Sequence, residues 1–125
     1  MKGHCLCGAV RFTISGPLKW TGYCHCESCR RNCSAPVTAF LGVADGDWAW
    51  TGAAPATYSH SDHATRSFCA RCGTPMAYAT TKLPAETHFY AAALENPEDY
   101  RPAQHFFISE ALSWLHIEDD LPRKG

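Results

Sequence analysis

Eight cysteines at short, regular spacings constrain the fold of this 125-residue chain more than any other feature. Cys5 and Cys7 form one pair, Cys69 and Cys72 form another, and residues 24–29 hold a set of three. Thiols spaced in this way indicate metal ligation before disulfides wherever the compartment keeps thiols reduced. We therefore expect a small domain whose fold depends partly on bound metal.

The two outer pairs predict one closed zinc site. The two residues between Cys69 and Cys72 let both thiolates bind one Zn²⁺ from a tight turn. Cys5 and Cys7 supply the other half, and four thiolates at a Zn–S distance of about 2.3 Å complete a tetrahedral, structural site. A redox dithiol at Cys69 and Cys72, or cysteines that act as small buried hydrophobic residues, are the alternatives.

Cys24, Cys26 and Cys29 predict a second zinc site of a different kind. Three protein ligands with one open position are typical of catalytic zinc, and a free thiol suits the fourth position. The alternative is that one of these cysteines joins a structural site while the others are spare. Cys33 follows four residues later, and it would close the second site if it bound the metal. A small buried residue or a resolving thiol is the other interpretation of Cys33.

Charged and titratable residues surround the second set. His25 lies between two candidate ligands, so its ring should point away from the metal and act at most through a hydrogen bond to a thiolate. Arg30 and Arg31 follow the set, where they would offset its negative charge or hold an anionic ligand. Solvated arginines are the equally simple alternative.

Short runs of β-branched and aromatic residues, separated by glycine and proline, predict an all-β fold of small antiparallel sheets in a single domain, residues 1–125. Asp45 and Gly46 predict a turn between two arms of a hairpin, 37–43 and 48–50. Helical turns are expected at 28–32 and 95–100. The expected strands are 10–14, 37–43, 48–50, 57–60, 65–68, 76–79, 88–94, 104–108 and 114–117.

Composition excludes several classes of function. The net charge is −1, and no basic run is present to bind phosphates, so we expect no nucleic-acid partner. No stretch of 18 apolar residues and no apolar leader occurs, so we expect a cytoplasmic protein without a membrane partner. Charged residues make up only 18% of the chain, which permits a homodimer.

The three cysteine motifs together resemble one family, the glutathione-dependent formaldehyde-activating enzymes, whose domain also occurs in centromere protein V. A weaker similarity continues at Pro102, His105, Trp114 and residues 120–122. Cys33 departs from the small residues that are usual nearby in the family. The motifs that carry the resemblance are residues 3–12 (GHCLCGAVRF), 24–31 (CHCESCRR) and 68–75 (FCARCGTP).

The resemblance implies an Mss4-like fold of small sheets joined by zinc, with two zinc ions per chain. It implies a structural zinc on Cys5, Cys7, Cys69 and Cys72, and a catalytic zinc on Cys24, Cys26 and Cys29. It also implies a carbon–sulfur lyase activity, in which glutathione or another small thiol and formaldehyde form S-hydroxymethylglutathione. A non-catalytic zinc module that binds protein and a reductase of the methionine-sulfoxide type are the alternatives.

Overall fold

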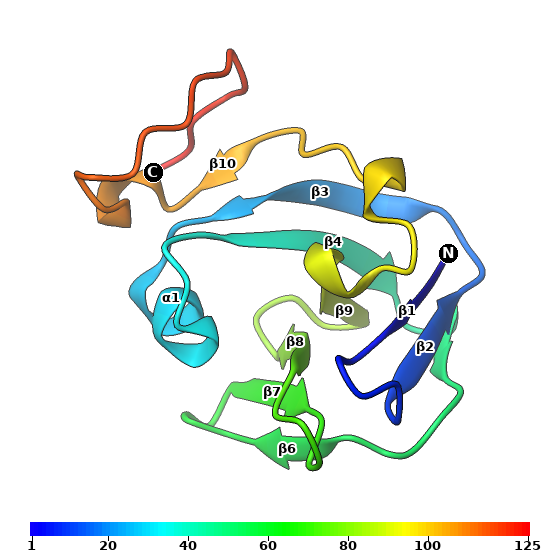
Figure 1. Cartoon of the computed structure of the whole chain (residues 1–125). Helices are drawn as coiled ribbons and strands as arrows, with labels where there is room; N and C mark the ends of the chain where they lie inside the picture. The colour runs from blue at the N-terminus through cyan, green and yellow to red at the C-terminus, as the bar shows by residue number, and fades with distance from the viewer.

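A computed structural model describes all 125 residues, and short strands dominate it (Figure 1). The strands are β1 (Lys2–His4), β2 (Arg11–Ile14), β3 (Leu18–Cys24), β4 (Thr38–Ala44), β5 (Trp48–Trp50), β6 (Ala56–Tyr58), β7 (Ala64–Phe68), β8 (Pro75–Thr80), β9 (Glu86–Tyr90) and β10 (His105–Phe106). They form a seven-stranded sheet in the order β10-β3-β4-β9-β8-β7-β6 and a three-stranded sheet in the order β1-β2-β5. The expected all-β fold of small sheets is confirmed, with β10 and β3 as the one parallel pair.

One α-helix, α1 (Glu27–Cys33), interrupts the strands. The Cys26 side chain accepts a hydrogen bond from the Cys29 N–H at its start, and Ser34 ends it in the left-handed conformation with φ of 52°. Three single 3₁₀ turns follow later in the chain, at Ala91–Ala93, Pro97–Asp99 and Ile108–Glu110. The turns expected at 28–32 and 95–100 are therefore present as α1 and the second 3₁₀ turn.

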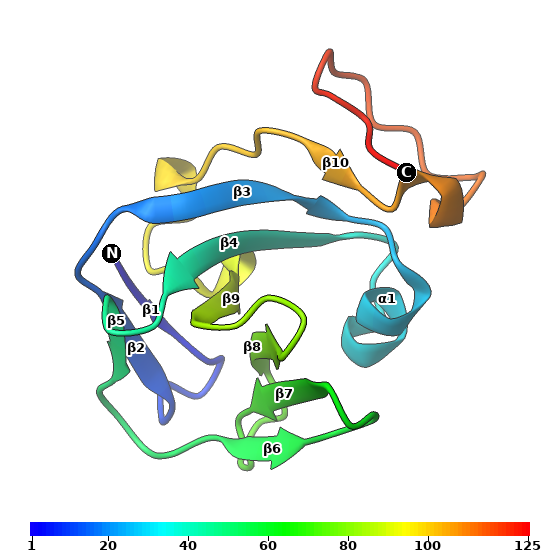
Figure 2. The ribbon, with the colours of Figure 1, turned by 180° about the vertical axis from the view of Figure 1, so that it is seen from behind.

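The core joins the two sheets. Phe12 of β2 stacks on Phe89 of β9 with ring centroids 4.4 Å apart, and both side chains are fully buried. Trp50 of β5 packs edge-on against both rings. Every residue of β9 is buried, including the polar Glu86, Thr87 and His88. Figures 1 and 2 show the small sheet and α1 at opposite sides of the molecule.

Several expected elements differ from the structure. The run 88–94 ends as a strand at Tyr90 and continues as a 3₁₀ turn, and 104–108 keeps only two residues in β10. Residues 114–117 form no strand. The turn after β4 is present, yet β4 pairs with β9 while β5 pairs with β2, so the expected hairpin arms belong to different sheets.

β3 is the longest strand that the sequence did not predict, because Gly22 interrupts its run of β-branched and aromatic residues. Gly22 is required by close packing, since a Cβ there would lie 2.7 Å from Phe106 Cε2 and 2.9 Å from the carbonyl oxygen of Gln104. The missing side chain lets β10 pair beside β3. The strand β3 matters for function because it ends at Cys24.

Candidate metal centres

Four cysteines from two distant turns gather their sulfur atoms into one cluster. Cys5 and Cys7 lie in the turn between β1 and β2, and Cys69 and Cys72 lie in the turn between β7 and β8. All four Sγ atoms lie within 4.8 Å of one another. The cluster thus connects the edge of the small sheet to the large sheet across more than sixty residues of chain.

The two turns share two local features, a glycine with positive φ and a backbone N–H that donates to a sulfur. Gly8 and Gly73 each follow the second cysteine of a pair, and each has φ of +80°, a conformation that glycine adopts without a steric penalty. Backbone N–H groups donate to the sulfurs from within these turns, from Val10 to Cys5 Sγ at 3.3 Å and from Cys72 to Cys69 Sγ at 3.4 Å. These contacts stabilise thiolates in the position that a metal requires.

The sulfur spacing fits tetrahedral zinc. Four sulfurs at a Zn–S distance of about 2.3 Å lie about 3.8 Å apart along each edge of a tetrahedron. The Cys5–Cys7 and Cys7–Cys69 sulfurs are 3.6 and 3.8 Å apart. The donor set and its geometry are therefore those of a closed site with four thiolates.

Three further sulfurs form a second cluster around the start of α1. Cys24 ends β3, Cys26 caps the helix, and Cys29 lies in its first turn. Their sulfurs lie within 4.8 Å of one another, with Cys24 and Cys26 3.4 Å apart. Cys24 and Cys29 are buried, while Cys26 is partly exposed. All three cysteines lie within residues 24–29, so this cluster constrains only one local segment of the chain.

The three thiols lose their protons unequally. The hydrogen bond from Cys24 to Cys26 lowers the pKa of Cys26 far below its usual range and raises the pKa of Cys24 above it. Cys29 also hydrogen-bonds to Cys26 and lowers the pKa of that thiol further. A thiolate therefore forms first at Cys26, which gives an incoming cation an anionic ligand.

Arg66 of β7 is the positive charge behind this cluster. Arg66 is only 3% exposed, and its guanidinium has no carboxylate partner. Its guanidinium donates to Cys29 Sγ at 3.5 Å, to Ser28 Oγ at 3.2 Å and to the Tyr90 hydroxyl at 3.0 Å. The guanidinium also lies 4.7 Å from the centre of the Tyr78 ring. Burial lowers the pKa of Arg66, but the charges and hydrogen bonds of Cys29 and Tyr90 together outweigh burial, so the net pKa rises.

Replacing Arg66 by methionine should weaken metal binding at the three-cysteine cluster by about 10- to 100-fold, the usual cost of losing a group that supports a ligand. The reason is that three thiolates and one divalent cation carry a net negative charge, which the buried guanidinium offsets. Chelator competition on the metal-loaded variant measures the loss. Arg31→Met is the matched control, since Arg31 is exposed on α1 and pairs with Glu27. Equal losses in both variants would contradict a specific role for Arg66.

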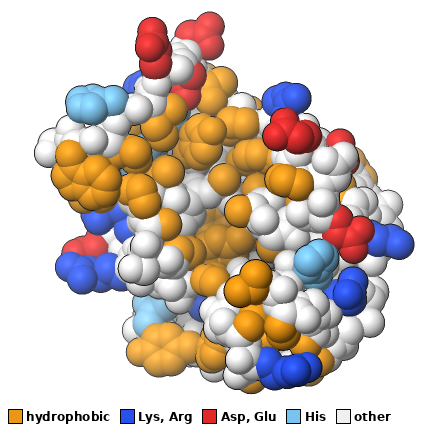
Figure 3. All heavy atoms as spheres, in the orientation of Figure 1, with side chains coloured by type: hydrophobic (Ala, Val, Ile, Leu, Met, Phe, Trp, Pro, Cys, Tyr) orange, Lys and Arg blue, Asp and Glu red, His pale blue; other side chains and the backbone are white.

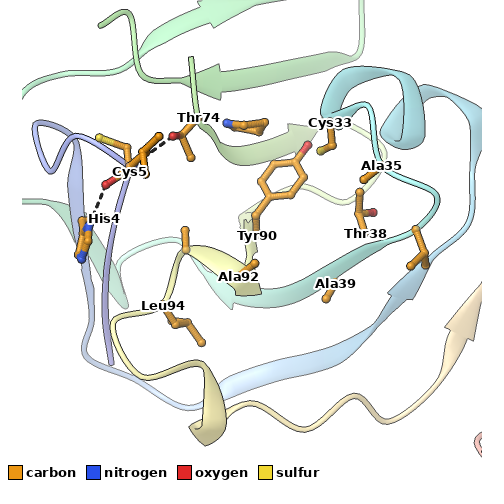
Figure 4. Close-up of a pocket in the computed structure, with 14 residues that line it drawn as sticks. His4, Cys5, Cys33, Ala35, Thr38, Ala39, Thr74, Tyr90, Ala92 and Leu94 are labelled. Atoms are coloured by element: carbon orange, nitrogen blue, oxygen red, sulfur yellow. Dashed lines mark hydrogen bonds between the residues drawn. The ribbon is translucent and has the colours of Figure 1, made fainter. Parts of the chain in front are cut away.

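Cys33 lies outside the second cluster. It lines a separate apolar cavity of about 480 Å³, which it shares with Tyr90 and Thr38. Figure 4 shows the Tyr90 hydroxyl directed toward Cys33. Figure 3 shows hydrophobic side chains around a hollow near the centre of the face that is seen in Figure 1. Burial raises the pKa of the Cys33 thiol. The structure therefore does not bring Cys33 to the three sulfurs as a fourth ligand.

The ring of His25 is directed away from the sulfurs, as expected for a residue between two ligands. Its Nε2 lies 2.8 Å from Nδ1 of His105, whose Nε2 lies 2.9 Å from Asp119 Oδ2. His25 and His105 are both buried. This chain of contacts ties the C-terminal segment to the turn that carries Cys24 and Cys26, and sequence reasoning did not connect these residues.

The arginines that the sequence singled out do not contact the sulfurs. Arg30 donates to the carbonyl oxygens of His25 and Glu110, and Arg31 pairs with Glu27. The buried cation is instead Arg66, whose position in a strand of mixed polarity gave no signal. By donating to the carbonyl oxygen of His25, Arg30 thus holds the backbone between Cys24 and Cys26 in place.

The second cluster opens into a large cavity. A space of about 790 Å³ is lined by all three cysteines and by residues of β3, β8, β9 and the C-terminal segment. This volume is in the range of small-molecule sites. No member of the four-cysteine cluster lines it.

None of the helices in the molecule has the length and apolar character needed to cross a bilayer.

Comparison with known proteins agrees with the cysteine pattern. A protein of Halomonas elongata that carries the name of a glutathione-dependent formaldehyde-activating enzyme is 25% identical over 94% of this chain and 81% of its own length. A protein of Schizosaccharomyces pombe described as an uncharacterized lyase is 34% identical over 64% of this chain and 58% of its own length.

A crystal structure of a Rhodobacter sphaeroides protein superposes with a TM-score of 0.64 at 26% identity, covering 79% of this chain and 94% of that one. The model of the family described as glutathione-dependent formaldehyde-activating enzyme matches residues 1–110. The match includes both cysteine clusters and every residue that lines the large cavity. The chain belongs to the family of glutathione-dependent formaldehyde-activating enzymes.

Proposed function

We propose that this protein is a zinc-dependent enzyme of the carbon–sulfur lyase type, which forms or cleaves the adduct of a small thiol, such as glutathione, with formaldehyde. In this proposal the four-cysteine cluster holds a structural zinc, and Cys24, Cys26 and Cys29 hold a catalytic zinc. A reducing compartment such as the cytoplasm suits both the thiolate ligands and the thiol substrate. Family membership supports the reaction type.

The observation that carries the proposal is the contrast between the two clusters. The four-sulfur cluster is complete for tetrahedral zinc and lies away from the large cavity. The three-sulfur cluster lacks one ligand for a tetrahedron and forms part of the cavity wall. A site with three protein ligands beside a ligand-sized cavity has the arrangement of catalytic rather than structural zinc.

Zinc in this site would lower the pKa of a thiol that completes its coordination, so that the thiol is a thiolate near neutral pH. The thiolate sulfur would attack the formaldehyde carbon, and a C–S bond would form. The carbonyl electron pair moves to the oxygen, which takes up a proton and becomes the hydroxyl of an S-hydroxymethyl product. Cleavage of the adduct is the same sequence in reverse.

Residues of this chain prepare the site for that chemistry. Arg66 neutralises part of the thiolate charge from the side away from solvent and fixes Cys29 and Ser28 by hydrogen bonds. Its hydrogen bond to Tyr90 holds the guanidinium in place. The apolar rings of Phe40 and Phe106 line the cavity and limit water beside the reacting sulfur.

Protein purified without chelator should contain two zinc ions per chain, and the second should accept one thiol from solution. Elemental analysis gives the metal count. Cobalt substitution at the second site then reports the added thiolate, because each thiolate–cobalt bond adds charge-transfer absorption. One metal per chain after zinc supplementation, or no spectral change with glutathione or 2-mercaptoethanol, would contradict the proposal.

The reductase alternative is disfavoured by the position of Cys33. A sulfoxide reductase requires a reactive thiolate, and burial raises the pKa of this thiol instead. A binding module without catalysis would have no use for a cavity beside an incomplete metal site. The two-zinc enzyme therefore accounts for more of the structure than either alternative.

A further inference from the structure

A buried carboxylate lies in the wall of the large cavity, away from the three cysteines. Glu86, at the start of β9, is 8% exposed, and its Oε2 accepts a hydrogen bond from Trp20 Nε1 at 2.8 Å. Its Oε1 forms an ion pair with Lys19 Nζ at 3.7 Å, which is beyond hydrogen-bonding distance, so Oε1 accepts no hydrogen bond. Lys19 is half in solvent and does not line the cavity. Oε1 of this buried carboxylate can thus still accept a hydrogen bond from a ligand.

An unsatisfied histidine lies beside this carboxylate. The His88 side chain is 8% exposed, and its Nε2 lies 3.3 Å from Glu86 Oε2 but makes no hydrogen bond. A buried polar atom without a partner is costly unless a ligand or water completes its contacts. His88 lines the cavity together with Glu86, so a polar ligand group entering this end would meet both side chains.

Aromatic rings enclose the same place. Trp20 packs edge-on against His88 at 4.7 Å between ring centroids, and Tyr78 and Phe40 follow at 5.5 and 6.2 Å. All of them line the cavity. Aromatic faces around a carboxylate attract ammonium groups, because the ring quadrupole and the anion both favour a cation.

The register of the sheet gives the distance from this end of the cavity to the cysteines. Trp20 pairs with Gly42, which pairs with His88, whereas Cys24 lies four residues further along β3. Glu86 pairs with Ala44, two positions further from the cysteines, but its carboxylate reaches back to the Trp20 ring at 2.8 Å. Four residues of a strand span about 13 Å. A peptide of two or three residues is about 7–11 Å long, and a metal–sulfur bond of about 2.3 Å adds to its reach. A ligand with its thiol at the cysteines therefore needs the length of a short peptide to reach Glu86.

We propose that Glu86, His88 and Trp20 form a subsite for the α-ammonium group of a peptide thiol whose sulfur lies at the three-cysteine cluster. The inference rests on the proposed function, because that function places a thiol at the cluster. The ammonium group donates to Glu86 Oε1 and lies against the rings. Lys82, the one lysine that lines the cavity, is available for the neighbouring α-carboxylate. Glutathione has this head group on its γ-glutamyl residue.

The test compares two thiols that differ only in the ammonium group. Glutathione and glutaryl-cysteinylglycine, which lacks the amino group, are titrated by calorimetry into the zinc-loaded wild type and Glu86→Gln. The wild type should bind glutathione at least about tenfold more tightly than the analogue, since a hydrogen bond between charged groups is lost. Glu86→Gln keeps an oxygen for the Trp20 N–H and should bind both thiols equally. Glu118→Gln, outside the cavity, should discriminate as the wild type does.

The outcomes separate this inference from the proposed function. If 2-mercaptoethanol and glutathione both bind but the wild type does not distinguish glutathione from its analogue, the ammonium subsite is wrong and the proposed function stands. If no thiol binds the zinc-loaded protein, the proposed function fails and the subsite fails with it. The comparison of ligands on the wild type needs no variant, so a folding defect in Glu86→Gln cannot obscure the result.

Discussion

Cys72→Ser should unfold most of the protein at temperatures where the wild type is fully folded, with a fall in Tm of roughly 20 °C or more. The substitution removes a thiolate from the cluster that joins the β1–β2 turn to the β7–β8 turn. Structural zinc contributes on the order of 10 kcal/mol to the folding of small zinc domains. That is comparable with the whole stability of a typical domain.

The Cys72 side chain is well suited to this role. The Thr74 hydroxyl lies 3.2 Å from Cys72 Sγ, and this hydrogen bond is the largest of several that together lower the pKa of Cys72 to about 5. The lowered pKa favours the thiolate form of Cys72, which is the form that binds metal. Serine has no comparable anionic form near neutral pH, so the variant loses a ligand and a charge together.

Thermal melting followed by circular dichroism, with zinc content measured on the same samples, tests the Cys72→Ser prediction. Cys33→Ser is the matched control, because it is the same chemical change at a cysteine outside both clusters. The control should keep both metals and melt close to the wild type. A Cys72→Ser protein that keeps two zinc ions and the wild-type Tm would show that the four-cysteine cluster does not hold the fold together.

Cys29→Ser should give the opposite combination: a folded protein that retains one zinc but has lost thiol binding and turnover. Turnover should fall by more than about 100-fold, since the loss of a supporting group alone costs 10- to 100-fold. Cys24, Cys26 and Cys29 come from one segment of six residues, so little long-range constraint disappears with their metal. Arg66 also loses one hydrogen-bond partner but keeps Tyr90 and Ser28.

Metal content, Tm and thiol titration on Cys29→Ser and Cys72→Ser together decide between a catalytic and a structural role for the second cluster. If Cys29→Ser unfolds as completely as Cys72→Ser, both clusters are structural. If it keeps two zinc ions and full thiol affinity, Cys24, Cys26 and Cys29 do not form the reacting site.

The grouping of the cysteines could be predicted from sequence because metal ligation imposes short spacings within each turn. Cys69 and Cys72 indicate a metal turn by spacing alone, and Gly73 follows where the turn needs a positive φ. The joining of these residues to Cys5 and Cys7 follows from counting ligands for a tetrahedron. Short strands such as β2 and β7 were predictable for a similar reason, since their alternation is local.

Arg66, Glu86 and His88 could not be assigned from sequence because their roles depend on strand pairing. Arg66 reaches Cys29 only because β7 follows β8 in the sheet. Glu86 meets Trp20 across β4, and no spacing rule relates positions 66 residues apart. By contrast, the end of the strand at Tyr90 had a local signal, because the three alanines of the following 3₁₀ turn are poor strand formers.

The split of the four-cysteine cluster along the chain has a consequence for synthesis on the ribosome. Cys7 and Cys69 are 62 residues apart, which corresponds to about 3–12 s of translation at 5–20 residues per second. During that interval the nascent chain exposes the first pair of thiols without its partner pair. Oxidation or capture of a foreign metal can therefore compete with assembly in newly made protein, whereas a full-length chain refolding from denaturant presents all four sulfurs at once.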